Sequence, residues 1–260
     1  MAYETLQFGT EAGVATITLA QPEKRNAISS QMIAELLAAL DETERGEARV
    51  VILTGAGKAF CAGMNLEELK ALAGKSPGQN LEDSRRMAQM FHRLYAFPKP
   101  VIAAVNGPAI AGGCGLATLA DFTLAVTDAK FGYTEVKIGF IPALVSVFLR
   151  RQIGEKRARD LLLSGRIFEA QEAREMGLVS EIVPADVLMA RAKELAASLL
   201  AASPVSILRT KRLLIDLQEA ELHEELERAI RANAEIRSTV DFREGLAAFL
   251  EKREPRWTGR

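Results

Sequence analysis

Two stretches of small residues could perform chemistry with their backbone alone. Residues 60–66 read Phe-Cys-Ala-Gly-Met-Asn-Leu, and residues 111–116 read Ala-Gly-Gly-Cys-Gly-Leu. Small side chains let a carbonyl oxygen approach the main chain, and the N–H groups at the start of a helix are unpaired and partially positive. Each stretch could therefore supply a donor to an oxyanion, worth roughly 3–4 kcal/mol of barrier. The alternative is that these glycines only permit tight turns and close helix packing.

Glycine-rich loops also bind phosphates and dinucleotides, but the spacing argues against both uses. Phe60 stands where the third glycine of a dinucleotide fingerprint would follow Gly55 and Gly57. Thr118 stands at the same place in the second stretch, and Ile52 replaces the first glycine of a P-loop. The oxyanion interpretation and the packing interpretation therefore remain.

The surrounding pattern predicts an α/β fold. Runs of β-branched and apolar residues predict strands over 14–19, 50–54, 101–105 and 122–126, and apolar spacing predicts a helix over 31–44. A second helix is expected to end near residue 97, and Pro142 suits the first turn of a helix that runs to about residue 152. The polar residues 74–80 are expected to form a mobile connection. Strands and helices thus alternate, and a charged, all-helical tail follows.

Composition excludes several function classes. The chain has 260 residues with 33 basic and 34 acidic side chains, so the excess of positive charge that a nucleic-acid binder needs is absent. No apolar run reaches the roughly 18 residues that a membrane span needs, and no secretory signal is visible. Two cysteines and two histidines do not suggest a disulfide framework or a metal site. We therefore expect a cytoplasmic protein with no nucleic-acid partner, no membrane partner and no metal.

Motifs spread over nearly the whole chain resemble the crotonase family, the enoyl-CoA hydratase/isomerase superfamily. They occur in family order at residues 21–27, 50–55, 58–66, 99–107, 111–114, 131–135, 138–142, 173–179 and 244–253. The resemblance implies a crotonase-like spiral of ββα turns over residues 1–200, which would hold the active site. It also implies a C-terminal helical region over residues 201–260 that forms a homotrimer or a dimer of trimers. Because this fold hosts many chemistries, the resemblance specifies the reaction only loosely.

The resemblance also implies a substrate and the residues that would bind it. The substrate would be an acyl-CoA thioester, with coenzyme A present only as part of it and no other cofactor. The thioester oxygen would lie between the backbone N–H groups of Met64 and Gly112. Phe249 and Lys252 match tail positions that can contact CoA from a neighbouring subunit. The positions implied for substrate or CoA binding are Lys24, Arg25, Ala27, Ala62, Gly63, Gly115, Phe249 and Lys252.

Glu135 is the candidate acid or base. Its neighbours in sequence are mostly apolar, and an apolar pocket raises the pKa of a carboxyl group toward neutrality. It matches one of the two glutamates of a typical hydratase. The second would lie about twenty residues earlier, where this chain has Gly115. Glu67 or Glu68 could supply a replacement carboxylate, although both are placed to begin an exposed helix.

Three functions are compatible with a single carboxylate. A hydratase or dehydratase could use Glu135 to activate water, and residues 135–146 resemble hydratases of branched substrates such as 3-methylglutaconyl-CoA. A Δ3-Δ2-enoyl-CoA isomerase could use the same glutamate to move a proton between two carbons. A non-catalytic acyl-CoA-binding protein is the third. Covalent catalysis by Cys61 or Cys114 is not expected, because His92 and His223 fall in polar helical segments.

Overall fold

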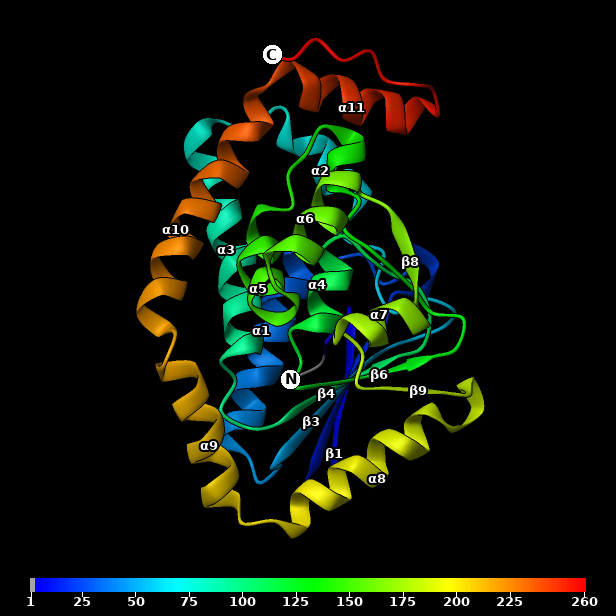
Figure 1. Ribbon diagram of the computed structural model, residues 1–260, viewed down its shortest axis with the longest axis vertical. Helices are drawn as coiled ribbons and strands as arrows, with labels where there is room; N and C mark the ends of the chain where they lie inside the picture. The colour runs from blue at the N-terminus through cyan, green and yellow to red at the C-terminus, as the bar shows by residue number, and fades with distance from the viewer. Residues whose placement is uncertain (1–2) are drawn as a thin grey trace.

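Two sheets organise residues 3–260, the part of the chain that the computed structural model describes. In the larger sheet β1 is antiparallel to β2, and the other neighbours are parallel. Its order is β1 (Leu6–Glu11), β2 (Val14–Leu19), β3 (Val50–Gly55), β4 (Val101–Val105), β6 (Phe122–Val126) and β9 (Glu181–Val183). The smaller sheet contains β5 (Ala109–Ile110), β7 (Lys130–Gly132) and β8 (Ile167–Glu169). In Figure 1 the strands lie among the helices, with β8 on the right-hand side of the molecule.

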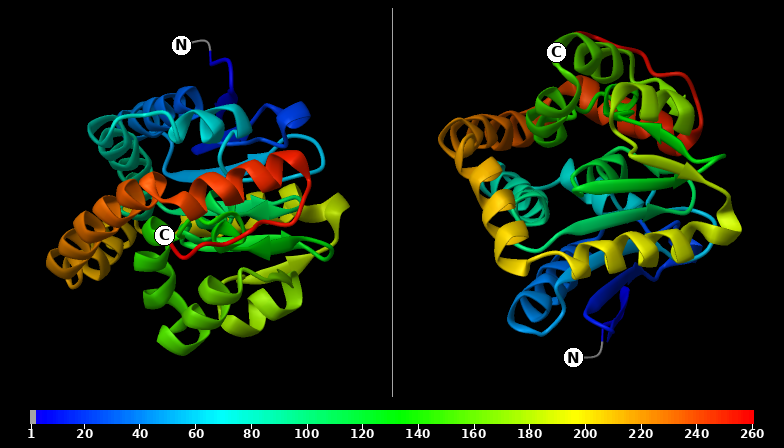
Figure 2. Two further views of the ribbon diagram at one scale, coloured as in Figure 1. Left: turned by 90° about the horizontal axis from the view of Figure 1, so that it is seen from above. Right: turned by 60° about the horizontal axis from the view of Figure 1, so that its bottom comes forward.

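The helices cover the sheets and then extend away from them. The first seven are α1 (Ser30–Arg45), α2 (Leu66–Leu72), α3 (Pro77–Tyr95), α4 (Gly112–Thr118), α5 (Ala143–Ile153), α6 (Glu155–Ser164) and α7 (Ala170–Met176). The last four are α8 (Leu188–Ala201), α9 (Pro204–Asp216), α10 (Glu219–Glu235) and α11 (Val240–Glu251). Single turns of 3-10 helix are η1 (Pro22–Lys24), η2 (Glu135–Ile138), η3 (Ala185–Val187) and η4 (Ile236–Ser238). Helix α8 packs across β3, β4 and β6, whereas α10 packs along α3 and α5 (Figure 2).

Local sequence patterns explain most of these elements. The predicted strands match β2, β3, β4 and β6, and every residue of β3 and β4 is buried, as their apolar runs require. The predicted α1 is present, and the Ser29 side chain accepts a hydrogen bond from the Met32 amide at its start. These elements confirm the predicted α/β class.

Within the expected mobile connection over residues 74–80, residues 74–76 lie between α2 and α3, but residues 77–80 form the start of α3. Helix α3 begins at Pro77, and the Ser76 side chain accepts a hydrogen bond from the Gln79 amide while the Gln79 side chain accepts one from the Ser76 amide. This capping box satisfies two backbone donors, so polar residues that resemble a loop form the first helical turn.

The C-terminal helices place their apolar residues unequally. Helix α10 buries Leu222, Leu226 and Ile230, whereas α9 exposes several large apolar side chains. Within residues 3–260, no helix combines the length and the apolar character that a membrane span requires. The proposed boundary at residue 200 stays a prediction.

Candidate active site

Four separate segments pair side by side to build the candidate site. Ile28 donates to the Gly63 carbonyl at 2.7 Å, and Asn65 donates back to Ile28 at 2.7 Å. The first glycine stretch in turn pairs with the second, because Ile110 donates to the Cys61 carbonyl at 2.9 Å. The ladder then continues to β7, which ends three residues before Glu135. The two stretches of small residues therefore converge, and the glutamate follows the next strand.

The amides of Met64 and Gly112 are available to a ligand. Among residues 3–260, neither N–H has a hydrogen-bond acceptor, whereas the neighbouring N–H groups of Asn65 and Ala111 donate to backbone carbonyls. Gly63 stands close to the second stretch, since a methyl group in place of its hydrogen would lie 3.1 Å from the Ala111 Cβ atom. The geometry therefore brings together the two donors that the sequence analysis singled out.

Ala111 holds the second stretch in an unusual conformation. Its φ of 51° and ψ of −125° lie in a region that residues with a side chain rarely adopt. Its amide donates to the Gly132 carbonyl at 2.7 Å, which fixes the peptide between Ile110 and Ala111. Strain of this kind costs about 1–3 kcal/mol and persists where the surroundings impose it. The dihedral angles of Ala111 set the direction of the Gly112 N–H group at the start of α4.

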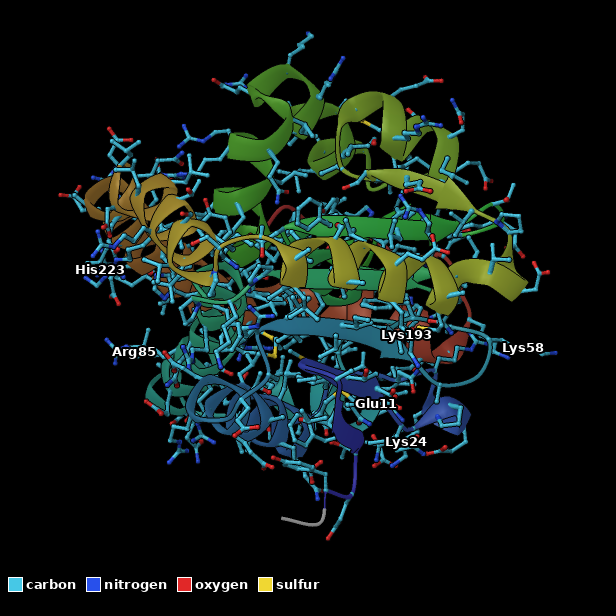
Figure 3. All side chains as sticks on the ribbon, turned by 90° about the horizontal axis from the view of Figure 1, so that it is seen from below. Glu11, Lys24, Lys58, Arg85, Lys193 and His223 are labelled. Atoms are coloured by element: carbon cyan, nitrogen blue, oxygen red, sulfur yellow. The ribbon has the colours of Figure 1, made fainter. Side chains whose placement is uncertain are left out.

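A cavity of about 690 Å³ opens beside these amides. Most of its lining is apolar, and the polar members come from the 22–27 loop, η4 and residues in or next to α2, η2 and α10. In Figure 3, Lys24 of this loop and His223, near the start of α10, lie on opposite sides of the view. The sequence-predicted site residues in its wall are Lys24, Arg25, Ala27, Ala62, Met64, Gly112, Glu135 and Phe249.

Three predicted binding positions lie outside the wall. Gly63 packs against the second glycine stretch, Gly115 lies inside α4, and Lys252 is an exposed residue at the end of α11. Phe249 lines the cavity of its own chain, where α11 packs against η2, and its contact with CoA from a neighbouring subunit stays a prediction. Lys24 and Arg25 are exposed at the cavity rim.

Glu135 is buried in the cavity wall. Only 9% of its surface is exposed, and its Oε2 atom has no hydrogen-bond partner among the described residues. Burial disfavours the charged form and raises the pKa of Glu135 to about 7. A carboxyl group with such a pKa can both accept and return a proton near neutral pH. Glu135 is therefore not a surface charge at the end of a strand.

The raised pKa predicts how the Glu135→Gln variant changes stability. Folding favours the protonated carboxyl, so the contribution of Glu135 to stability declines as the pH rises from about 4.5 to about 7. Glutamine is neutral at all pH values. We expect the free energy of unfolding of the variant to exceed that of the wild type by up to roughly 3 kcal/mol at pH 8. At pH 4 we expect the two to be equal. Urea unfolding at both pH values measures this, and an equal gain at both would contradict it.

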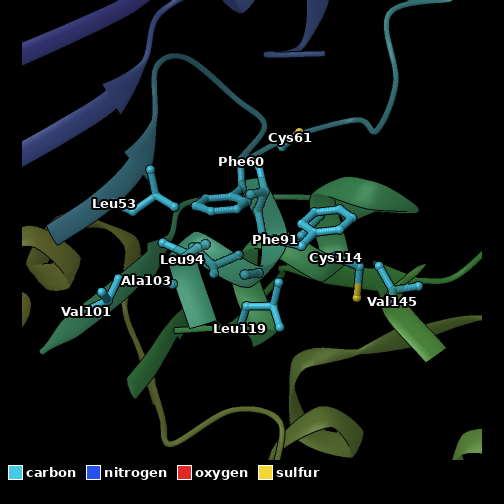
Figure 4. Packing of buried hydrophobic residues seen from close by; sticks show 14 of the residues in the cluster. Leu53, Phe60, Cys61, Phe91, Leu94, Val101, Ala103, Cys114, Leu119 and Val145 are labelled. Carbon is cyan, nitrogen blue, oxygen red and sulfur yellow. The ribbon is translucent and has the colours of Figure 1, made fainter. Parts of the chain in front are cut away.

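The second carboxylate of a typical hydratase has no room here. A side chain at position 115 would meet the Val145 Cγ1 atom at 2.6 Å and the Phe91 ring at 3.4 Å. Figure 4 shows Phe91, Cys114 and Val145 close together in the core. Glu68 is no substitute, because both of its oxygens accept from Ser30 at the start of α1. Of the two candidate replacements, Glu67 alone lines the cavity, where it is exposed.

The two thiols are inert members of the core. Cys61 and Cys114 are fully buried, and burial raises the pKa of each thiol to about 12. A thiol nucleophile must be ionised, so neither cysteine is suited to that role near neutral pH. Within the described residues, no group of three or more His, Cys, Asp or Glu side chains is arranged to hold a metal ion.

Sequence reasoning missed three polar residues of the site. Asn26 is buried and donates from Nδ2 to the carbonyls of Ala56 and Ala59, which fastens the 22–27 loop to the segment just before the first glycine stretch. Asn233 and Arg237 line the cavity from the C-terminal helices. Asn26 could have been found because it lies inside the family motif at residues 21–27. The other two carry no local signal, because they fall in a highly charged helical segment.

Comparison with known proteins agrees with this geometry. Residues 9–260 match the family model described as enoyl-CoA hydratase/isomerase. A Thermus thermophilus protein named as an enoyl-CoA hydratase is 47% identical over 94% of this chain and 97% of its own length. The 2,3-dehydroadipyl-CoA hydratase of Escherichia coli is 36% identical over 95% of this chain and 96% of its own. The crystal structure of an enoyl-CoA hydratase/isomerase from Xanthobacter autotrophicus superposes with a TM-score of 0.90 at 33% identity, covering 99% of this chain and 100% of that one.

The family model covers nearly the whole chain, and the matched structures share its crotonase fold with a C-terminal helical region. The relatives bear the names of enzymes that act on acyl-CoA compounds. The protein is therefore an enzyme and a member of the enoyl-CoA hydratase/isomerase family, the crotonase superfamily.

Proposed function

We propose that the protein hydrates an enoyl-CoA thioester, or dehydrates the corresponding 3-hydroxyacyl-CoA, with Glu135 as its acid and base. The observation that carries the proposal is a single buried carboxyl in the wall of a cavity that two unpaired amides also line. The thioester oxygen would accept hydrogen bonds from the N–H groups of Met64 and Gly112. Lys24 and Arg25 at the rim would neutralise CoA phosphates, and Ala27 and Ala62 would contact its pantetheine and adenine.

The proposed reaction balances with one carboxyl group. Ionised Glu135 takes a proton from water while the water oxygen bonds to C3 of the enoyl group. The double-bond electrons move to C2 and onto the thioester oxygen, where the Met64 and Gly112 amides stabilise the enolate. Protonated Glu135 then returns its proton to C2. A pKa of about 7 serves both halves of this cycle.

One observation favours isomerisation as a second candidate. Val145 and Phe91 occupy the space beside Gly115. A water molecule in that part of the site would therefore have no second carboxylate to bind it. Glu135 could instead remove a proton from C2 of a 3-enoyl-CoA and deliver it to C4, with the same enolate stabilised by the same amides. A non-catalytic acyl-CoA-binding protein is the remaining alternative, and the enzyme names of the relatives argue against it.

Substrate assays separate these functions. Purified protein would be incubated with crotonyl-CoA, 3-methylglutaconyl-CoA and a 3-enoyl-CoA, and hydration and isomerisation would be followed separately. Turnover of either of the first two supports the hydratase, and turnover of the 3-enoyl-CoA alone supports the isomerase. Acyl-CoA binding without turnover of any of the three would refute both. The compartment that we propose is the cytoplasm.

A trimer or a dimer of trimers is the assembly that we propose, with α9 at its contacts. Leu213 and Leu214 on α9 and Leu217 just after it are 59%, 60% and 72% exposed, which is unusual for neighbouring leucines that face water. We expect the wild type to have the mass of three or six chains of 28.3 kDa, and Leu214→Glu/Leu217→Glu to have the mass of one. Light scattering after size-exclusion chromatography measures this. Leu163→Glu, at a 76% exposed leucine of α6, is the matched control, and loss of the trimer in that control would contradict the assignment to α9.

A further inference from the structure

The wall of the cavity contains a buried polar pair that the proposed mechanism does not use. Asn233 lies near the end of α10 and Arg237 in η4, four residues later, and they are 4% and 1% exposed. Both line the cavity, among apolar neighbours such as Leu69 and Met87. Polar groups at this depth are normally satisfied by partners, so each of their atoms has to be accounted for.

The amide of Asn233 is oriented by its neighbours. Arg237 Nη2 lies 2.8 Å from one polar atom of that amide, and a guanidinium only donates, so the atom must be the oxygen Oδ1. Ser84 Oγ donates to the same oxygen at 2.6 Å. The Nδ2 group has no hydrogen-bond acceptor among residues 3–260, and Asn233 is part of the cavity wall. The pair presents a fixed donor.

Arg237 adds positive charge that is only partly neutralised. Its Nη1 atom donates to Asp83 at 2.7 Å and to the Asn80 side chain at 3.2 Å, but its buried Nε atom lacks a partner among the described residues. Asp83 is shared with Lys75, whose Nζ atom lies 3.0 Å away. Two cations thus share one carboxylate, and the cluster of Lys75, Asp83 and Arg237 keeps an excess of one positive charge.

Phe140 connects this pair to the proposed acid and base. Its amide donates to the Glu135 carbonyl at 3.1 Å, and the Arg237 Cζ atom lies 5.7 Å from the centre of its ring. One residue therefore contacts both groups. Glu135, Asn233 and Arg237 also line the same cavity, so one acyl chain bound there can lie against all three.

We propose that Asn233 and Arg237 receive a carboxylate at the far end of the acyl chain, so that the substrate class is an ω-carboxyacyl-CoA thioester. A carboxylate only accepts hydrogen bonds and is negative, which complements an unpaired donor and an excess positive charge. An alkyl end would leave the Asn233 donor unpaired after water has been displaced. This inference rests on the proposed acyl-CoA function and narrows its substrate.

Binding of saturated thioesters tests the inference without turnover. Each pair of ligands differs by one terminal carboxylate: glutaryl-CoA against butyryl-CoA, and adipyl-CoA against pentanoyl-CoA. Isothermal titration calorimetry would give the affinity ratio within each pair. We expect the wild type to bind the carboxylate ligand of at least one pair roughly 10- to 100-fold more tightly, as for a hydrogen bond to a charged group.

Two matched variants locate the effect. Asn233→Asp keeps the oxygen that Ser84 and Arg237 bind but replaces the donor with a second carboxylate oxygen, so the affinity ratio should fall to about one or below. Asn80→Asp adds the same charge beside Arg237 at a buried residue outside the cavity wall but leaves the Asn233 donor in place, so the ratio should fall less than in Asn233→Asp. Circular dichroism melting confirms that both variants fold.

Equal affinities in the wild type for both pairs would overturn the inference, as would an unchanged ratio in Asn233→Asp. A ratio lost equally in both variants would also overturn it, since the effect would then be one of overall charge. The preference could persist in a protein that turns over no enoyl-CoA, in which case the proposed function fails and the inference stands. Failure of every thioester to bind would overturn both.

Discussion

Glu135→Gln is expected to lower kcat about 10³-fold, because general acid–base catalysis by a positioned side chain contributes roughly 10²- to 10⁴-fold. Glutamine keeps the size and burial of the side chain but cannot exchange a proton. The wild type should also lose activity as the pH falls below about 7, since the ionised carboxyl starts the reaction. Initial rates between pH 5 and 9, measured for both proteins on whichever enoyl-CoA is turned over, provide the comparison.

Glu67→Gln is the matched control for this experiment. Glu67, at the start of α2, also lines the cavity, but it is exposed to solvent. Its variant should keep most of the activity and the same acidic limb of the pH profile. If Glu67→Gln lost as much activity as Glu135→Gln, the assignment of a single acid and base would be wrong.

Gly113→Ala is expected to lower kcat/KM by about 10²- to 10³-fold, the effect of losing one oxyanion donor. The new methyl group would lie 2.2 Å from the Cys61 carbonyl oxygen and 2.7 Å from its carbon, so the start of α4 must move away from the first glycine stretch. That movement separates the Gly112 amide from the Met64 amide. A displacement near 1 Å is enough to cost about 10²-fold in rate.

Gly78→Ala is the control for replacing a glycine by alanine. Gly78 lies in α3, and nothing lies within 4 Å of the position that its new methyl group would take. Alanine favours a helix over glycine by about 1 kcal/mol, so this variant should gain stability and keep its activity. Melting curves and rates would be measured for both variants below their melting temperatures. A folded Gly113→Ala protein with full activity would show that the spacing of the two amides is unimportant.

The parts of the fold that sequence predicted are those with strong local patterns. The apolar run of β4 leaves few alternatives to a buried strand, and Ser29 marks the start of α1 through its own hydrogen bond. By contrast, β7 and β8 have three residues each, and their pairing depends on segments more than thirty residues apart. No local pattern specifies such short strands.

The site follows the same division. The glycine stretches and Glu135 could be singled out because small residues and an isolated carboxylate are conspicuous among apolar neighbours. The filling of the space beside Gly115 could not, since it depends on Val145 of α5. Arg237 is the clearest omission: it stands in a charged segment that resembles a solvated helix, and only the docking of α10 on α3 buries it.

The ladder that joins residues 26–28, 61–65, 109–111 and 132 has a consequence for how the enzyme becomes active. Segments that are neighbours in this ladder are far apart in the sequence, and Glu135 follows the last segment. Contacts of this kind form late, because each must first close a long loop. No short fragment of the chain contains all four segments and Glu135. We therefore expect activity to appear only when the whole core has folded.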